Sequence, residues 1–230
     1  MFTNIKCITF DLDDTLWPVV PVIERAEQKL YDWLSQHYPK ITANYSVEAL
    51  TQHRSTWNQT VPELAHDVTR LRWQYLVELA EAFGYTKALA DDGLALFRDY
   101  RNQVTPFQSV QPVLSELEKS YTIGAITNGN AQLEKMAIGR YFKFSISAEQ
   151  MGANKPCSSL FHEAASKAGA EFEQLLHIGD SAEADVIGAN KAGCRSVWFN
   201  PARQAWPGGQ NPDAVIHCIS ELPALVSRTQ

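Results

Sequence analysis

The stretch Phe10-Asp11-Leu12-Asp13-Asp14-Thr15-Leu16-Trp17 places three carboxylates within four positions. The carboxylates follow an apolar run from Ile5 to Phe10, and the β-branched and aromatic residues of this run predict a short strand. Carboxylates crowded at a strand end repel one another, and a bound divalent cation reverses that repulsion. An aspartate can also attack phosphorus and carry the phosphoryl group. The alternative is an acidic turn that caps a helix, because Asp is common at such positions.

The overall composition is that of an ordinary globular protein. Of its 230 residues, 45% are hydrophobic and 20% are charged, so the chain can form one large domain or a domain with a smaller module. The formal net charge is -6, no Lys/Arg cluster stands out, and a nucleic-acid surface is therefore not expected. Apolar runs are too short to cross a bilayer, and the N-terminus lacks a signal-peptide pattern.

The cysteines add a further constraint on location and chemistry. They are scattered along the chain without a CxxC pair, which indicates neither a zinc site nor a disulfide framework. Small buried thiols in a reducing compartment are the simpler explanation. We therefore expect a cytoplasmic protein with no membrane or nucleic-acid partner, and the sequence leaves the oligomeric state open.

The segment after the acidic stretch has helical periodicity. Apolar residues recur on one helix face from Val22 onward, and no part of this region predicts a strand. Further helices are predicted at about residues 47–57, 62–83 and 88–100. A crossover between parallel strands needs only about a dozen residues. Residues 18–105 are therefore predicted to form an inserted helical cap domain, with linkers at both ends that would form a hinge.

The second half of the chain alternates between strands and helices. Together with the first strand, the predicted strands cover residues 121–126, 143–147, 175–178, 195–199 and 214–216. The helices between them are predicted at residues 112–119, 131–139, 158–168 and 182–192. This alternation is typical of the α/β fold class, with a doubly wound, Rossmann-like parallel sheet. Residues 1–17 and 106–230 are predicted to form this catalytic core.

Polar clusters follow three of the predicted strands, where open parallel sheets bind their ligands. They are Asp11–Thr15, Thr127–Gly129, and Gly179–Ser181 with nearby Asp185, and Lys155 precedes a predicted helix. Each cluster alone fits a turn, a cap or a solvated lysine. Together they supply a nucleophile, a proton donor, phosphate donors, a cation and a metal site, which are the parts that phosphoryl transfer needs.

The order of these clusters resembles the four motifs of the haloacid dehalogenase superfamily. The matching segments are Asp11-Leu12-Asp13-Asp14-Thr15, Ile126-Thr127-Asn128-Gly129, Lys155-Pro156 and Gly179-Asp180-Ser181-Ala182-Glu183-Ala184-Asp185. The resemblance spans the whole chain, and the helical insertion is similar to the first type of cap in that superfamily. It implies a magnesium-dependent phosphomonoester hydrolase that acts on a small phosphorylated metabolite through an aspartyl-phosphate.

The resemblance also implies the role of each site residue. Asp11 is the nucleophile, and Asp13 protonates the leaving alcohol and then deprotonates the hydrolytic water. Lys155 offsets the negative charge of Asp11 and the phosphate. Phosphate binding is implied for Thr127 and for the backbone N–H groups of Asn128 and Gly129. The implied Mg²⁺ ligands are Asp11, the backbone carbonyl of Asp13, Asp180 and Asp185, the last acting through water or by holding Lys155.

Asp13 separates members of the superfamily. Its dehalogenases lack an acid at this position, because the departure of a halide needs no proton donor, so Asp13 points to phosphoryl transfer. A phosphomutase of the same superfamily remains an alternative. A receiver-like signalling module phosphorylated on Asp11 is another, although the inserted cap and Asp13 both argue against a long-lived phosphorylated state.

The cap is expected to select the substrate. Polar and cationic groups gather near the start of its third predicted helix, and tryptophans nearby are able to stack on a ring. These residues are His66, Asp67, Arg70, Arg72, Trp57 and Trp73. Arg70 is predicted to bind substrate, with an ordinary solvated helix face as the alternative. Residues 125–132 and 66–70 are also similar to superfamily members that hydrolyse a ribitylamino-uracil phosphate, which makes this ester a candidate substrate.

Overall fold

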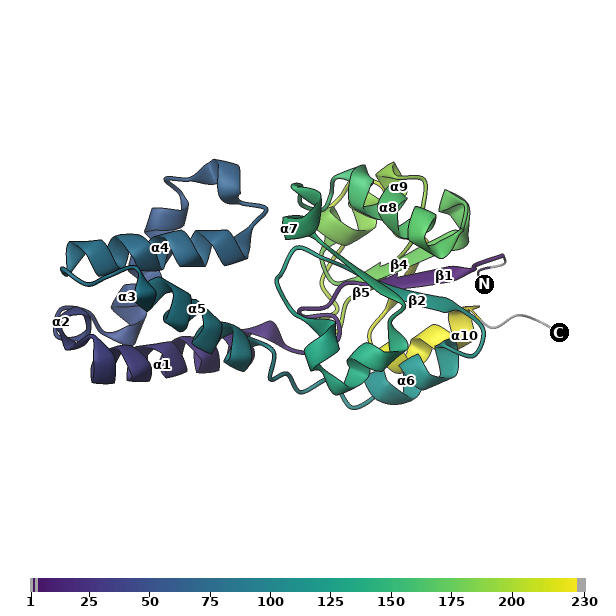
Figure 1. Ribbon diagram of the computed structural model, residues 1–230. Helices are drawn as coiled ribbons and strands as arrows, with labels where there is room; N and C mark the ends of the chain where they lie inside the picture. The colour runs from purple at the N-terminus through teal and green to yellow at the C-terminus, as the bar shows by residue number, and fades with distance from the viewer. Residues whose placement is uncertain (1, 3, 227–230) are drawn as a thin grey trace. The chain divides into compact units, whose positions relative to one another are not determined.

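The computed structural model describes residue 2 and residues 4–226, and these form two compact units (Figure 1). One unit consists of Met1–Pro18 and Thr105–Gln230, and the other is the segment Val19–Val104 between them. Within the described residues, no helix combines the length and the apolar character needed to cross a membrane. Each unit has its own hydrophobic core.

The larger unit is built on a six-stranded parallel sheet with the order β3-β2-β1-β4-β5-β6. The strands are β1 (Cys7–Phe10), β2 (Thr122–Thr127), β3 (Phe144–Ser147), β4 (Leu175–Gly179), β5 (Arg195–Phe199) and β6 (Ala214–Ile216). Every residue of β1 and β4 is buried, as expected for central strands covered on both faces. The predicted doubly wound α/β fold is therefore confirmed.

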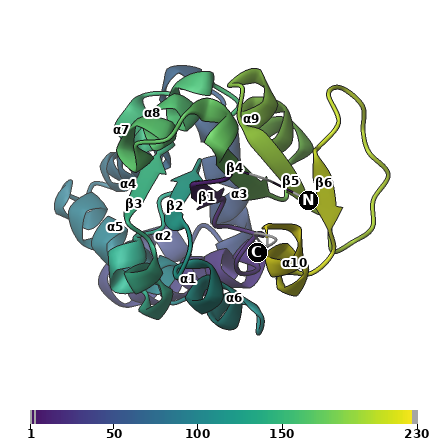
Figure 2. The ribbon, with the colours of Figure 1, turned by 90° about the vertical axis from the view of Figure 1, so that its right-hand side faces the viewer.

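Helices cover both faces of this sheet (Figure 2). On one face lie α7 (Ala148–Met151), α8 (Ser158–Ala168) and α9 (Gly188–Lys191), and on the other lie α6 (Val110–Leu117) and α10 (Leu222–Val226). Phe161 and Leu160 of α8 are completely buried against the sheet. Close packing also limits the sheet residues, because a Cβ atom at Gly124 would lie 2.3 Å from the Phe144 ring.

The strand order creates a switch point beside β1. The chain passes from β1 to β2 and β3 on one side, and then continues with β4 on the other side of β1. In open parallel sheets, ligands bind beyond the carboxyl ends of the strands at such a point. The segments that follow β1, β2 and β4 start at Asp11, Asn128 and Asp180, so the predicted polar clusters meet there.

The smaller unit is entirely helical among its described elements. It contains α1 (Val19–His37), α2 (Pro39–Thr42), α3 (Val47–Asn58), a 3₁₀ turn (Pro62–Leu64), α4 (Val68–Ala82) and α5 (Ala88–Arg101). Helices α1, α4 and α5 pack around a core that includes Leu30, Leu76 and Phe97. The helix α1 begins three residues earlier than predicted, since Pro21 lies in its first turn, where no intrahelical N–H donor is required.

Three predicted helices have a different form in the structure. The segment 62–83 is divided, because the Asp67 side chain accepts from the Arg70 N–H and starts α4. The segment 131–139 consists of two 3₁₀ turns, Leu133–Lys135 and Ala137–Tyr141. The segment 182–192 begins as a π-helix, Ala182–Ile187, before α9. A capped helix start, 3₁₀ turns and a π-helix differ from a regular α-helix in their hydrogen bonds, and apolar periodicity does not distinguish among them.

Candidate active site

The acidic stretch leaves β1 through a tight loop. The Asp11 N–H still donates to the Ile178 carbonyl at 2.8 Å, so the sheet holds the backbone of Asp11 in place. Asp14 is exposed and has a left-handed φ of 58°, which Asp tolerates better than most side chains. The Trp17 indole donates to Asp13 Oδ1 at 2.9 Å. Asp11 is therefore fixed at the strand end, and the hydrogen bond from Trp17 orients the Asp13 carboxylate.

A buried lysine joins the clusters. Lys155 is 4% exposed, and its ammonium donates to Asp11 Oδ1 at 2.6 Å, Asp185 Oδ1 at 2.6 Å and the Ile126 carbonyl at 2.8 Å. Burial alone would favour the neutral amine, but attraction by Asp11 and Asp185 raises the pKa of Lys155 above its ordinary value. The three protons of the cationic ammonium thus have three acceptors, and the position of Nζ is fully determined.

The carboxylates outnumber this cation. Carboxylate oxygens of Asp11, Asp180 and Asp185 all lie within 4.8 Å of one another. Burial, together with the charges of Asp185 and Asp14, raises the pKa of Asp180 to about 6. Burial also raises the pKa of Asp11, with Lys155 acting in the opposite direction and Asp185 adding to the rise. The site therefore carries excess negative charge that a divalent cation would compensate.

The segment after β2 supports the lysine in a way that the sequence did not indicate. The Asn128 side chain donates to the Lys155 carbonyl at 3.2 Å and accepts from the Lys155 N–H at 2.8 Å. Thr127 Oγ1 accepts from the Gly129 N–H at 2.9 Å, which shapes the turn beside it. For Asn128, the sequence predicted only that its backbone N–H binds phosphate. Its side-chain contacts with Lys155 join residues 27 positions apart, and such contacts leave no local sequence pattern.

Two further side chains hold Asp180 in place, and neither role was predicted from the sequence. Thr15 Oγ1 lies 3.2 Å from Asp180 Oδ1 and accepts from the Asp180 N–H at 3.1 Å. The Trp198 indole donates to the Asp180 carbonyl at 2.8 Å. Thr15 stands inside the quoted motif and offered a signal, whereas Trp198 reaches the site only because β5 pairs with β4.

Gly179 provides the space for Asp185. A Cβ atom at this glycine would lie 2.2 Å from Asp185 Oδ2, so a larger residue would displace the carboxylate that holds Lys155. The Ser181 N–H donates to the same oxygen, Asp185 Oδ2, at 2.9 Å. Displacement of the carboxylate would therefore also break this hydrogen bond. The sequence Gly179-Asp180-Ser181 is therefore constrained by packing as well as by chemistry.

The predicted site residues of the larger unit surround one cavity of about 250 Å³. Its lining consists of Asp11, Asp13, Thr127, Asn128, Gly129, Lys155, Asp180, Ser181, Ala184 and Asp185. The structure thus gathers every predicted residue except Arg70, which belongs to the helical unit. A cavity with several carboxylates, one buried ammonium and a hydroxyl is suited to an anionic substrate bound with a cation.

The polar residues of the helical unit have separate environments. Arg72 is 7% exposed and donates to Glu27 at 2.8 and 3.2 Å, while its guanidinium lies 3.3 Å from the Phe97 ring centroid. Arg72 therefore has a structural environment within the core of this unit. Asp67 caps α4, and Arg70 is exposed in its first turn. The indoles of Trp57 and Trp73 donate to Glu78 and Asp91.

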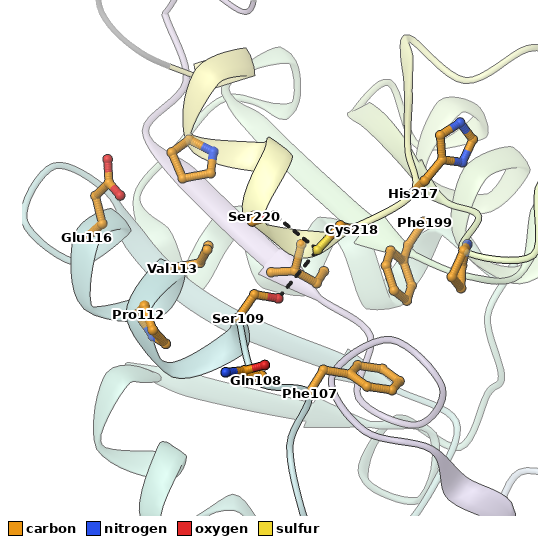
Figure 3. A pocket seen from close by; sticks show the side chains of 13 residues that line it. Phe107, Gln108, Ser109, Pro112, Val113, Glu116, Phe199, His217, Cys218 and Ser220 are labelled. Atoms are coloured by element: carbon orange, nitrogen blue, oxygen red, sulfur yellow. Dashed lines mark hydrogen bonds between the residues drawn. The ribbon is translucent and has the colours of Figure 1, made fainter.

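A larger cavity of about 750 Å³ lies elsewhere on the sheet unit (Figure 3). Its walls include the rings of Phe107 and Phe199, and the hydroxyls of Ser109 and Ser220 point toward Cys218 Sγ. The Ser220 hydrogen bond lowers the pKa of this thiol. This cavity lacks paired carboxylates and a buried ammonium, so its chemistry differs from that of the strand-end site.

The fold and the site define an α/β enzyme with an acidic, lysine-containing centre at the switch point of its sheet. A family model described as haloacid dehalogenase-like hydrolase matches residues 5–193. The chain is 32% identical to the 5-amino-6-(5-phospho-D-ribitylamino)uracil phosphatase YigB of Escherichia coli, over 97% of both chains. It is 28% identical to the glyceraldehyde 3-phosphate phosphatase of Methanopyrus kandleri, over 84% of this chain and 83% of that protein. The chain therefore belongs to the haloacid dehalogenase-like hydrolase family.

Solved structures support the same assignment. A structure described as a 2-haloacid dehalogenase from Pseudomonas syringae is 40% identical, with a TM-score of 0.90 over 96% of this chain and 98% of that chain. The predicted superfamily is confirmed, as is the prediction of an enzyme of its phosphatase class.

Proposed function

We propose that the protein is a Mg²⁺-dependent phosphomonoester hydrolase that works through an aspartyl-phosphate on Asp11. The observation that carries the proposal is the Lys155 ammonium, held at 2.6 Å from both Asp11 and Asp185 beside the third carboxylate, Asp180. A nucleophilic carboxylate must approach an anionic phosphate, and a fixed cation reduces the repulsion between them. Lys155 is positioned to do so before the substrate arrives.

The residues fit a magnesium ion. Mg²⁺ prefers oxygen ligands from one or two carboxylates together with water and phosphate oxygens. Asp11, Asp180 and the backbone carbonyl of Asp13 would hold it, with Asp185 acting through water while it holds Lys155. When bound, the ion would neutralise and orient the phosphoryl oxygens. The raised pKa of Asp180 supports this assignment, because a cation would relieve the same excess charge.

The remaining residues would divide the chemistry between them. Asp11 attacks phosphorus as the ester oxygen leaves, and Asp13 donates a proton to that oxygen. Asp13 then accepts a proton from the water that hydrolyses the aspartyl-phosphate. General acid–base catalysis of this kind contributes roughly a hundred- to ten-thousand-fold. Thr127 and the backbone N–H groups of Asn128 and Gly129 bind the phosphoryl oxygens, and Gly129 exchanges its contact with Thr127 for one with substrate.

A small phosphorylated metabolite is the proposed substrate, with 5-amino-6-(5-phospho-D-ribitylamino)uracil as the first candidate. The 32% identity to a phosphatase of that ester over nearly the full chain supports it. The glyceraldehyde 3-phosphate phosphatase among the relatives makes a smaller sugar phosphate the comparison substrate. Selection between such esters is assigned to the helical unit, in which Arg70 is exposed.

Phosphate release over a panel of esters tests this function. The panel contains the ribitylamino-uracil phosphate, glyceraldehyde 3-phosphate, hexose phosphates, nucleotides and p-nitrophenyl phosphate. We expect steady release of phosphate with Mg²⁺, loss of release with EDTA, and recovery when excess Mg²⁺ is restored. A parallel assay measures chloride release from 2-chloropropionate, for which we expect no activity because Asp13 is present.

Other outcomes would contradict the proposal in distinguishable ways. Chloride release without phosphate release would identify a dehalogenase. Transfer of the phosphoryl group within a sugar, without free phosphate, would identify a phosphomutase. A stable phosphorylated protein without turnover would identify a receiver-like module.

Arg70→Ala tests substrate selection by the helical unit. Arg70 is exposed, so its loss should leave the fold intact. We expect KM for the preferred metabolite to rise about tenfold, which corresponds to one charged hydrogen bond of roughly 1.4 kcal/mol. KM for p-nitrophenyl phosphate should stay unchanged. Lys87→Ala removes another exposed cation from the same unit and serves as the control. Equal KM values for the metabolite in both variants would remove Arg70 from the binding site.

A further inference from the structure

A histidine that the proposed chemistry does not use lies behind the site. His177 is in the middle of β4 and is 1% exposed. Its Nε2 atom lies 3.1 Å from Asp185 Oδ1, and its Nδ1 atom lies 2.9 Å from Thr9 Oγ1. Thr9 is the direct partner of His177 in the pairing of β1 with β4, so the sheet itself sets this contact. The Phe161 ring packs edge-on against the imidazole at a centroid distance of 5.1 Å.

The two hydrogen bonds determine which nitrogen carries the proton. Asp185 accepts from the Lys155 ammonium through Oδ1 and from the Ser181 N–H through Oδ2, so both of its oxygens are acceptors and the group is a carboxylate. A carboxylate only accepts hydrogen bonds, so the Nε2 atom must donate. The Lys155 ammonium already donates to the same oxygen, and the imidazole is completely buried, so a second cation at this carboxylate would be unfavourable. The ring is therefore neutral, with Nδ1 as an acceptor. The Thr9 hydroxyl is then the donor to Nδ1.

This arrangement fixes the carboxylate on which the lysine rests. Asp185 Oδ1 accepts from His177 and also from the Lys155 ammonium at 2.6 Å. The other oxygen, Oδ2, accepts from the Ser181 N–H at 2.9 Å. With both oxygens engaged, the carboxylate cannot rotate without the loss of a hydrogen bond. The direction in which Asp185 holds the ammonium is therefore set from the β4 side.

We propose that Thr9 and His177 form a positioning pair for Lys155. Thr9 selects the Nε2–H tautomer of His177, the imidazole orients Asp185, and Asp185 holds the ammonium against Asp11. Neither residue touches the cavity that would receive the substrate. The consequence for turnover rests on the proposed role of Lys155 and Asp11, whereas the tautomer and the orientation of Asp185 do not depend on it.

Nitrogen-15 NMR of the imidazoles tests the tautomer without any activity assay. In the metal-free wild-type protein at neutral pH, we expect His177 to be neutral and protonated on Nε2. The His177→Gln variant identifies the resonances by their absence. A protonated Nδ1, either in the other tautomer or in a doubly protonated ring, would overturn the proposal. In Thr9→Val the hydroxyl donor is lost with little change in volume, and we expect the resonance of the unprotonated Nδ1 to shift.

A matched pair of variants tests the consequence for catalysis. Gln at position 177 retains an N–H donor near the position of Nε2, whereas Phe retains the ring volume without a donor. We expect His177→Phe to lower kcat for p-nitrophenyl phosphate about 10- to 100-fold at unchanged KM, the range found when supporting hydrogen bonds are removed. We expect His177→Gln to recover most of that loss. Circular dichroism and Tm identify any variant that fails to fold.

The possible outcomes distinguish a failure of the positioning role from a failure of the proposed function. Equal losses of kcat in folded Phe and Gln variants would overturn the positioning role and leave only a packing role. If neither variant folds, Thr9→Val decides, since an unchanged kcat together with an unchanged Nδ1 resonance would overturn the pair. If the wild-type protein cleaves no phosphate ester, the proposed function fails, and the NMR result alone decides the tautomer.

Discussion

Replacement of Asp11 by asparagine is expected to reduce phosphate release by at least about a thousandfold for every ester in the panel. The amide has nearly the shape of the carboxylate but cannot attack phosphorus or carry the phosphoryl group. Its carbonyl oxygen can still accept from the Lys155 ammonium, now 2.6 Å from Asp11 Oδ1, so the fold should be retained. Steady-state phosphate release and circular dichroism measure the two effects.

Asp14→Asn is the matched control for this substitution. Asp14 belongs to the same loop, but it is exposed and lies outside the lining of the cavity. Asparagine tolerates its φ of 58°, so the loop should keep its conformation. We expect nearly wild-type turnover in this variant. If Asp11→Asn also retained normal turnover, Asp11 could not be the nucleophile, and the mechanism through an aspartyl-phosphate would be wrong.

Replacement of Lys155 by methionine is expected to affect both stability and activity. The ammonium is the cation between Asp11 and Asp185, and its side chain is 2% exposed. Its removal would leave two buried carboxylates facing each other, and removal of one partner from a buried pair typically costs about 3–5 kcal/mol. We expect the free energy of unfolding at neutral pH to fall by about this amount and turnover to be lost. Urea denaturation measures the former.

The pH dependence of this loss has a definite sign. In Lys155→Met, repulsion and burial should raise the folded-state pKa of these carboxyl groups above the unfolded value. The penalty is therefore present above the folded-state pKa and is relieved as the pH falls and a proton is bound. The difference from wild type should shrink toward acidic pH. A constant difference over the whole pH range would show that the loss comes from packing of the side chain.

Lys167→Met provides the comparison for an exposed ion pair. Lys167 lies 3.3 Å from Glu163 on the surface of α8, and both side chains are at least 40% exposed. Solvent screens such a pair, so its loss should cost at most about 1 kcal/mol. Equal destabilisation of the two lysine variants would show that burial of Lys155 adds nothing to the strength of its ion pairs.

Much of the sheet unit was predictable because its local signals agree with its tertiary structure. The predicted helix 158–168 and the predicted strands 195–199 and 214–216 coincide with α8, β5 and β6. In each case a short apolar segment is flanked by residues that favour a turn or a cap. In residues 62–83 the apolar periodicity is continuous, so a single helix was predicted where the structure has a 3₁₀ turn followed by α4. The break lies at Asp67, whose side chain accepts from the Arg70 N–H and caps α4.

Residue type and spacing are sufficient to predict the alternation of strands and helices, the inserted helical segment, and the acidic and polar residues at strand ends. The different environments of the aspartates could be seen only in the tertiary structure. Asp11 and Asp185 share the Lys155 ammonium, while Asp14 points to solvent. The partnership of Asn128 with Lys155 and of His177 with Asp185 likewise arises from strand order and register. Burial and distance set these charges and hydrogen bonds, and both exist only when residues far apart in the chain are packed together.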